Sequence, residues 1–272
     1  MSRQRVRGAK QTLRRDLECA LVALDGEAPL RDGSVHKARK AIKRARAALR
    51  LMRAEIGDAA YRRANLRLRD AARPLSRLRD AKVLLDVIAK LRAHDKDREL
   101  ATLEEELHRE REAARHEVAE RPATLRSIRR SIKSVLFESR SWRAPSDAML
   151  RRTVERLYRN GRKAFELADA DRSDETLLEA RKQSDYLGKA LDTRAGQPAR
   201  AAQRAEAVAD ALGDDHDLAV LAKKLGDTPR GRTERALLAQ LGRRRRKLQR
   251  TASKRGRHLY RHKAKSFARA EL

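Results

Sequence analysis

Residues 35–53 read VHKARKAIKRARAALRLMR, and this stretch decides the fold that the sequence predicts. At about 100° per residue, apolar side chains that recur every three or four residues share one side of a helix. These residues are Val35, Ala38, Ile42, Ala45, Leu49 and Met52. Basic side chains share another arc of the same helix. They are His36, Arg39, Lys40, Lys43, Arg46 and Arg50, with Arg44 at the flank. The stretch is therefore predicted to be an amphipathic helix with one side in a core and one cationic side.

The cationic arc contains no acidic residue before Glu55. A solvated helix face normally mixes charges, because like charges four residues apart repel each other by a few tenths of a kcal/mol. The arc therefore favours an external anion, with a merely solubilising surface as the alternative. His36 lies near the positive end of the helix dipole, where its ring could donate to an anion or simply pack at the helix start.

The same charge bias extends over the whole chain of 272 residues. Lys and Arg number 68 against 39 Asp and Glu, so the formal net charge of +29 predicts a polyanionic partner. Apolar residues still make up 40%, and only 12 Gly and 6 Pro interrupt them, which is typical of a helical protein rather than a disordered one. Aromatic residues make up 3%, so base stacking is not the expected binding mode.

Three classes of protein are not expected. The sequence has no apolar run of about 18 residues, so it predicts no membrane span. The N-terminal stretch MSRQRVRGAK lacks the apolar segment of a secretory signal, and the single Cys19 allows no intramolecular disulfide. We therefore expect a cytoplasmic protein.

Helical periodicity runs almost end to end without a convincing strand pattern, and it predicts about twelve helices. Breaks are predicted at glycine, proline and helix-start residues. They include Gly57–Asp58, Pro74, Pro122, Asp171–Ser173, Gly213 and Thr251–Ser253. Ser34 is predicted to open the helix of the cationic arc. Residues 139–146 resemble a hinge that divides six helices from six.

An internal repeat relates the two sides of this hinge. Residues 38–49, ARKAIKRARAAL, align with residues 180–191, ARKQSDYLGKAL, at an offset of 180 − 38 = 142 residues. A repeat of this length predicts two similar helical bundles, residues 1–140 and 145–272.

Further basic residues recur at helical spacing outside the first arc. In the first half they are Arg62, Arg69 and Arg73 together with Asn65, followed by Arg77, Arg79 and Lys82 beyond Pro74. In the second half they are Arg159, Arg162 and Lys163 beside Tyr158, then Arg181 and Lys182, which repeat Arg39 and Lys40. Guanidinium groups suit phosphate, because their planar fork makes two parallel hydrogen bonds, while Lys supplies a point charge.

Catalytic motifs are not evident. Asp215-His216-Asp217 invites a metal-dependent phosphohydrolase reading, but that chemistry needs more ligands, and no other His lies between His116 and His216. The run GRRRRK at 242–247 is more consistent with a charged helix surface than with a localisation signal. Without a P-loop or a nucleophile elbow, the sequence predicts binding without chemistry, with no cofactor and no metal.

Together these features resemble the CHAD family, the conserved histidine α-helical domain. The resemblance is carried by residues 35–53, by NLRLRDAARPLSRLRDAKVLLDVI at 65–88, by YRNGRKAFELADADRSDE at 158–175 and by LGDDHDLAVL at 212–221. It implies an all-α fold for residues 1–272 as a single domain, built from two four-helix bundles related by pseudo-two-fold symmetry. It also implies non-catalytic binding of inorganic polyphosphate by basic side chains around a central groove or pore.

The resemblance also assigns residues. The family's His-x-x-Arg-Lys-x-x-Lys-Arg pattern falls on His36, Arg39, Lys40, Lys43 and Arg44, and its first-half Arg-Asp pattern falls on Arg69, Arg73 and Arg79. In the second copy Leu178 replaces the His and Asp185 falls where Lys is usual, which leaves Arg181, Lys182 and Lys189, with His216 as a partial substitute. The first half is therefore expected to contribute more. Nucleic acid is the alternative partner, and association with polyphosphate granules stays open.

Overall fold

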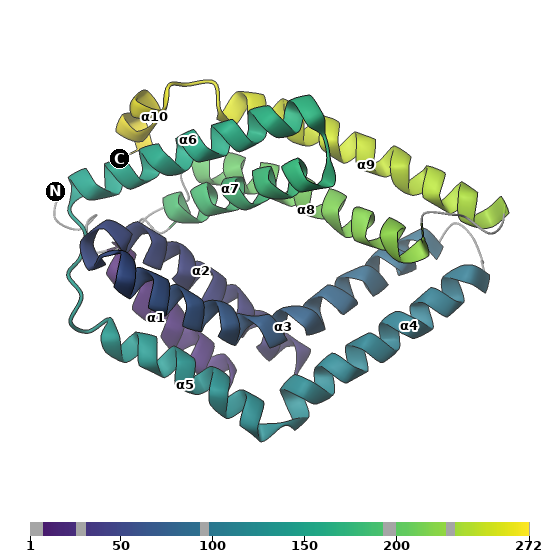
Figure 1. The fold of residues 1–272 in the computed structure, drawn as a ribbon, viewed down its shortest axis with the longest axis horizontal. Coiled ribbons are helices and arrows are strands. Elements are labelled where there is room, and N and C mark those ends of the chain that lie inside the picture. The colour runs from purple at the N-terminus through teal and green to yellow at the C-terminus, as the bar shows by residue number, and fades with distance from the viewer. Residues whose placement is uncertain (1–7, 26–30, 93–97, 193–199, 227–231, 272) are drawn as a thin grey trace.

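The computed structural model describes residues 8–25, 31–92, 98–192, 200–226 and 232–271 (Figure 1). Within these ranges it contains ten α-helices, one five-residue π-helical segment and no strand, which confirms the all-α class. The first five α-helices are α1 (Gly8–Ala23), α2 (Asp32–Ile56), α3 (Asp58–Arg92), α4 (Arg98–Arg115) and α5 (Pro122–Glu138), with the π-helical segment at His116–Glu120 before α5. The second five are α6 (Asp147–Asp171), α7 (Asp174–Asp192), α8 (Arg200–Leu225), α9 (Arg232–Leu259) and α10 (Ala264–Glu271).

Three predicted helix breaks are wrong, so the described residues form fewer helices than predicted. Helix α3 continues through Pro74, where Ala71 and Leu75 are buried, because this packing outweighs the lost backbone hydrogen bond. Helix α8 continues through the buried Gly213. Helix α9 continues through Thr251, whose hydroxyl donates to the Lys247 carbonyl 2.9 Å away and is satisfied inside the helix.

Other helix ends follow local signals. Gly57, at φ 81°, ends α2 in a conformation that disfavours other residues, and Pro122 opens α5. The side chain of Ser146 caps α6 by accepting from the Met149 amide at 3.3 Å. The prediction for Ser34 is wrong, because α2 begins two residues earlier at Asp32 and its N-cap is Arg31.

The segment 139–146 is non-helical, as predicted, and connects α5 to α6. Lys10 of α1 holds it by donating to the carbonyls of Arg140, at 3.0 Å, and Trp142. Five described α-helices precede this segment and five follow it.

Helix packing follows the same order on both sides of this segment. Helix α2 packs between α1 and α3, and α4 runs beside the far end of α3 (Figure 1). In the second half α7 packs between α6 and α8, and α9 runs beside α8. The order agrees with the sequence repeat, while the two-fold relation and the boundaries 1–140 and 145–272 remain predictions.

The two halves share their apolar cores. The main cluster contains buried residues from both, including Ile42, Leu68 and Leu187, each 0% exposed. A second cluster joins the end of α3 and the first half of α4 to α8 and α9, and it includes Ile88 and Leu221, each 0% exposed. The halves therefore meet at two places, where α2 packs on α6 and α7 and where α3 packs on α8.

At one position a glycine of α9 lies directly against a side chain of α6. A Cβ atom at Gly256 would lie 2.0 Å from Cε2 of Phe165, so only glycine fits there. No helix in the described ranges is apolar over enough length to cross a membrane.

Candidate functional site

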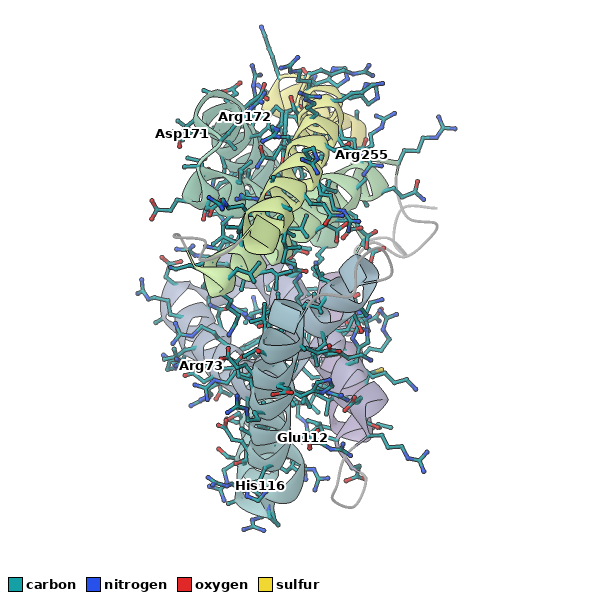
Figure 2. The ribbon with its side chains drawn as sticks, turned by 90° about the vertical axis from the view of Figure 1, so that its right-hand side faces the viewer. Arg73, Glu112, His116, Asp171, Arg172 and Arg255 are labelled. Atoms are coloured by element: carbon teal, nitrogen blue, oxygen red, sulfur yellow. The ribbon has the colours of Figure 1, made fainter. Side chains whose placement is uncertain are left out.

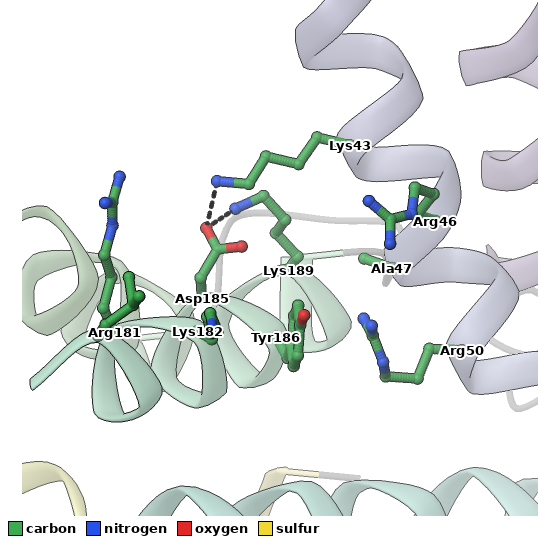
Figure 3. Close-up of a pocket in the computed structure, with 10 residues that line it drawn as sticks. Lys43, Arg46, Ala47, Arg50, Arg181, Lys182, Asp185, Tyr186 and Lys189 are labelled. Atoms are coloured by element: carbon green, nitrogen blue, oxygen red, sulfur yellow. Dashed lines mark hydrogen bonds and ion pairs between the residues drawn. The ribbon is translucent and has the colours of Figure 1, made fainter. Parts of the chain in front are cut away.

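A cationic pocket of about 200 Å³ lies between α2 and α7, the two helices that carry the sequence repeat (Figure 3). Each helix contributes three basic side chains. They are Lys43, Arg46 and Arg50 of α2, and Arg181, Lys182 and Lys189 of α7. Ala47, Leu178 and Tyr186 complete the lining, and Asp185 is the only carboxylate among the described residues that line it. The pocket therefore combines cations from both halves with one internal anion. We refer to it as the α2–α7 pocket.

Asp185 lies between two of these cations. Its Oδ1 is 3.0 Å from Nζ of Lys43, and Nζ of Lys189, one turn further along α7, also contacts it (Figure 3). The Asp185 side chain is 15% exposed, so these ion pairs are screened less than surface pairs. Burial, together with the charge of Lys43, lowers the pKa of Lys189 to about 7, while Glu206 and Asp210 act in the opposite direction.

Arg46 and Arg50, the two arginines of α2 that line the pocket, each contact a residue of another helix. The guanidinium of Arg50 lies 3.6 Å from the ring centroid of Tyr186, a cation–π contact between the two halves. Nε of Arg46 donates to Oδ1 of Asn65 on α3 at 3.0 Å. Burial lowers the pKa of Arg46, and the charges of Arg50 and Arg69 act in the same direction. Neither the asparagine nor the aromatic ring carries a negative charge, so both arginines keep their positive charge for a ligand.

Arg181 of α7 extends toward α8. A Cβ atom built on Gly213 would meet Nε and Nη2 of Arg181 at 3.5 Å, an ordinary packing distance. Burial lowers the pKa of His216 on α8, and the charge of Arg181 lowers it further. The pKa of His216 therefore depends on the Arg181 charge, although His216 does not line the pocket.

The start of α2 lies away from the α2–α7 pocket. His36 and Lys82 line a separate hollow with Asp32 and Leu78, and Lys40 is exposed. Nε of Arg39 donates to Oγ of Ser76 on α3 at 3.3 Å. Of the five residues that match the family's first pattern, only Lys43 lines the α2–α7 pocket.

Arg44 faces the core side of α2 rather than the pocket. Its Nε and Nη2 donate to Oδ1 of Asp16 on α1 at 3.1 and 2.9 Å, and the Asp16 side chain is fully buried. The hydrogen bond to Asp16 raises the pKa of Arg44. Arg44 therefore joins α2 to α1.

The remaining first-half residues lie on α3 outside the pocket. Arg69 is exposed and pairs with Asp70 at 3.1 Å, and Arg73 projects from the surface (Figure 2). Arg79 belongs to α3, but its side chain lies outside the described part of the structure.

The candidates on α6 are also not brought to the pocket. Arg159 pairs with Glu155 at 2.7 Å and Arg162 with Glu166 at 2.8 Å, so acids of the same helix offset both charges, while Lys163 is exposed. These side chains form a mixed-charge helix surface.

Tyr158 is a core residue, which corrects its assignment as a binding residue. It is 0% exposed, its ring stacks on Phe267 at 4.1 Å, and its hydroxyl lies within hydrogen-bond distance of the carbonyls of Leu259 and His262. Burial raises the pKa of the phenol. Burial of an aromatic ring on the apolar side of α6 stabilises the core, and its hydroxyl finds hydrogen-bond partners there.

Two contacts in the structure were not predicted from the sequence. Tyr186 lines the pocket, and its ring lies four residues after Lys182 on the same face of α7. Residues 242–247 were predicted to be a charged helix surface, whereas Arg245 pairs with the buried Asp215 at 3.1 Å and with Asp174. Among the described side chains, no group of three or more His, Cys, Asp or Glu is placed to hold a metal ion.

The fold and the site define an all-helical protein with a cationic pocket between two helices of matching sequence. Residues 15–226 match the sequence profile of the CHAD domain, and the chain belongs to this family. The profile spans α2 to α8 and most of α1, and α9 and α10 lie beyond it.

Solved structures show the same fold. The CHAD domain from the plant Ricinus communis aligns at a TM-score of 0.61 with 18% identity, over 98% of this chain and 90% of its own. PptA from Streptomyces chartreusis aligns at a TM-score of 0.64 with 16% identity, over 95% and 98%. No curated protein matches the sequence.

Proposed function

We propose that this protein binds inorganic polyphosphate in the α2–α7 pocket and catalyses no reaction on it. The observation that carries the proposal is the set of six basic side chains against one carboxylate at the junction of the two halves. Arginines and lysines that outnumber the acids around them favour a ligand with closely spaced negative charges. Polyphosphate binding is also the general property of the CHAD family, to which the chain belongs.

The arrangement suits a linear polymer of phosphates better than a single anion. Cations from α2 and α7 face each other, so successive phosphates of one chain can each meet a guanidinium or ammonium group from either helix. A polyphosphate chain that bridges the two helices binds with higher affinity than a single contact gives, because each contact after the first forms at a high effective concentration. The guanidinium of Arg50 stays accessible while its face rests on Tyr186.

Competition tests the identity of the ligand. Labelled long-chain polyphosphate is bound first, and then unlabelled polyphosphate, DNA, RNA, heparin or pyrophosphate is added at equal total charge. We expect polyphosphate to compete at lower concentration than either nucleic acid, because the described lining of the pocket offers six cations but a single aromatic ring for base stacking. Equal or better competition by DNA or RNA contradicts the proposal and favours a nucleic-acid-binding protein.

The absence of catalysis is tested separately. Incubation of purified protein with polyphosphate and Mg²⁺ or Mn²⁺ is expected to release no phosphate. Hydrolysis that co-purifies with the protein and disappears in a pocket variant contradicts this part of the proposal.

We place the binding activity in the cytoplasm, and a fluorescent fusion tests whether the protein accompanies polyphosphate granules.

A further inference from the structure

Asp185 occupies the position in the α2–α7 pocket where an anionic ligand would meet two lysines. Its carboxylate is within 3.0 Å of Nζ of Lys43 and is also contacted by Lys189. An ammonium group that contacts a carboxylate this way makes the same kind of charge-assisted hydrogen bond to a phosphate oxygen. The pocket therefore holds an anion of its own, supplied by α7.

The repeat explains how this pair arises. At the offset of 142 residues, Lys43 of the first copy corresponds to position 43 + 142 = 185 of the second. The structure brings these two corresponding positions into direct contact. Two lysines here would place like charges about 3 Å apart. The aspartate converts this repulsion into an ion pair and removes one binding cation from the pocket.

We propose that Asp185 is an internal competitor that makes the pocket selective for phosphate chains over short phosphate anions. This inference rests on the proposed function and names the residue that sets its selectivity. A short anion that binds between Lys43 and Lys189 must displace the carboxylate. A long chain reaches Arg46, Arg50, Arg181 and Lys182 around this position, so it binds whether or not Asp185 moves.

The geometry favours competition over a purely structural role. Asp185 retains 15% exposure, Lys43 is 45% exposed and Lys189 is 24% exposed, so solvent and ligand reach the pair. The buried acids among the described residues differ: Asp16 and Asp215 are 0% and 2% exposed and join neighbouring helices through Arg44 and Arg245. An acid that can be reached and that lines a cationic pocket is placed to compete with a ligand.

The test replaces Asp185 with its neutral isostere and measures affinity for two probes, inorganic triphosphate and long-chain polyphosphate. Asp185→Asn is expected to tighten triphosphate binding by about tenfold, which corresponds to about 1.4 kcal/mol. The gain for long-chain polyphosphate is expected to be about threefold or less. Glu175→Gln is the matched control, because it removes one exposed negative charge from the same helix outside the pocket. It is expected to change neither affinity by more than about 1.5-fold, because the charge is screened over about one Debye length.

The outcomes separate the two proposals. If the wild type binds long chains but Asp185→Asn leaves triphosphate binding unchanged or weaker, selectivity does not come from Asp185 and the inference is overturned. Equal gains in the Asp185→Asn and Glu175→Gln variants assign the effect to net charge and overturn it as well. If neither the wild type nor Asp185→Asn binds long-chain polyphosphate, although circular dichroism shows that both are folded, the proposed function itself is overturned. Asp185→Ala is measured alongside, so that a folding defect specific to Asn does not decide the result.

Discussion

Two Arg-Lys pairs at corresponding positions of the repeat allow a matched test of where polyphosphate binds. Arg39-Lys40 of α2 and Arg181-Lys182 of α7 are related by the offset of 142 residues and have the same composition. The family pattern favours the first pair, whereas only the second pair lines the α2–α7 pocket. Replacing each pair by Gln-Gln removes two positive charges in both cases, so the general electrostatic field of the protein changes equally.

The magnitude follows from the contacts. A charge-assisted hydrogen bond contributes about 1.5–3 kcal/mol, and partial solvent exposure reduces this to about 1 kcal/mol for each side chain. Arg181 forms no ion pair with a described residue, and Lys182 has only a 3.6 Å contact with the exposed Glu179. Arg181→Gln with Lys182→Gln should therefore weaken binding by about 2 kcal/mol, or roughly 30-fold. Arg39→Gln with Lys40→Gln should weaken it by less than about threefold, because neither side chain lines the pocket.

The assay is titration of labelled long-chain polyphosphate at physiological ionic strength, after circular dichroism has shown equal helix content. NMR titration of His216 adds a second readout: without the neighbouring Arg181 charge, the pKa of His216 should rise toward its ordinary value. Equal losses in the two double variants would refute the localisation of the site to the α2–α7 pocket. A greater loss for Arg39-Lys40 would favour a site at the start of α2, as the family pattern alone suggests.

Three further predictions concern salt, protons and packing. A site that neutralises about six phosphates should give a slope of about −4 to −5 for log affinity against log salt, by analogy with nucleic acids, and a slope near zero contradicts electrostatic binding. An anion stabilises the charged form of Lys189, whose pKa is about 7, so binding at pH 8 should take up a proton. Calorimetry in buffers of different ionisation enthalpy measures this uptake, which should be smaller in Lys189→Met. Gly256→Ala should lower the free energy of unfolding by about 2 kcal/mol or more, because the new methyl group overlaps Phe165. Unchanged stability in urea denaturation would mean that α9 can move away from α6.

Local periodicity was sufficient to predict the helices and their buried sides. The six apolar residues predicted for the inner side of α2, from Val35 to Met52, are all buried in the structure. The prediction succeeded because the side-chain direction on a helix repeats every 3.6 residues, about 100° each, whatever the helix packs against. Two of the helix breaks that were wrong, at Pro74 and Gly213, concern residues whose helix-breaking tendency is weaker than the burial of their neighbours.

The basic composition and the repeat likewise came from the sequence, but the choice among 68 basic residues did not. Periodicity placed Arg44 at the edge of the cationic arc, and only the packing of α1 on α2 turned it toward Asp16. Tyr158 stands next to Arg159 in the sequence, yet it points into the core while Arg159 points outward.

The sequence by itself therefore determined the all-helical class, the apolar sides of the helices, the excess of positive charge and the correspondence between α2 and α7. Only the tertiary structure decided that Lys43 and Asp185, at corresponding positions of the repeat, lie in contact, and that Arg50 rests on Tyr186. The physical reason is the distance along the chain over which the interactions act. Helix formation and amphipathicity depend on residues three or four apart, whereas the pocket depends on how two helices in different halves of the chain pack against each other, which short spacings do not encode.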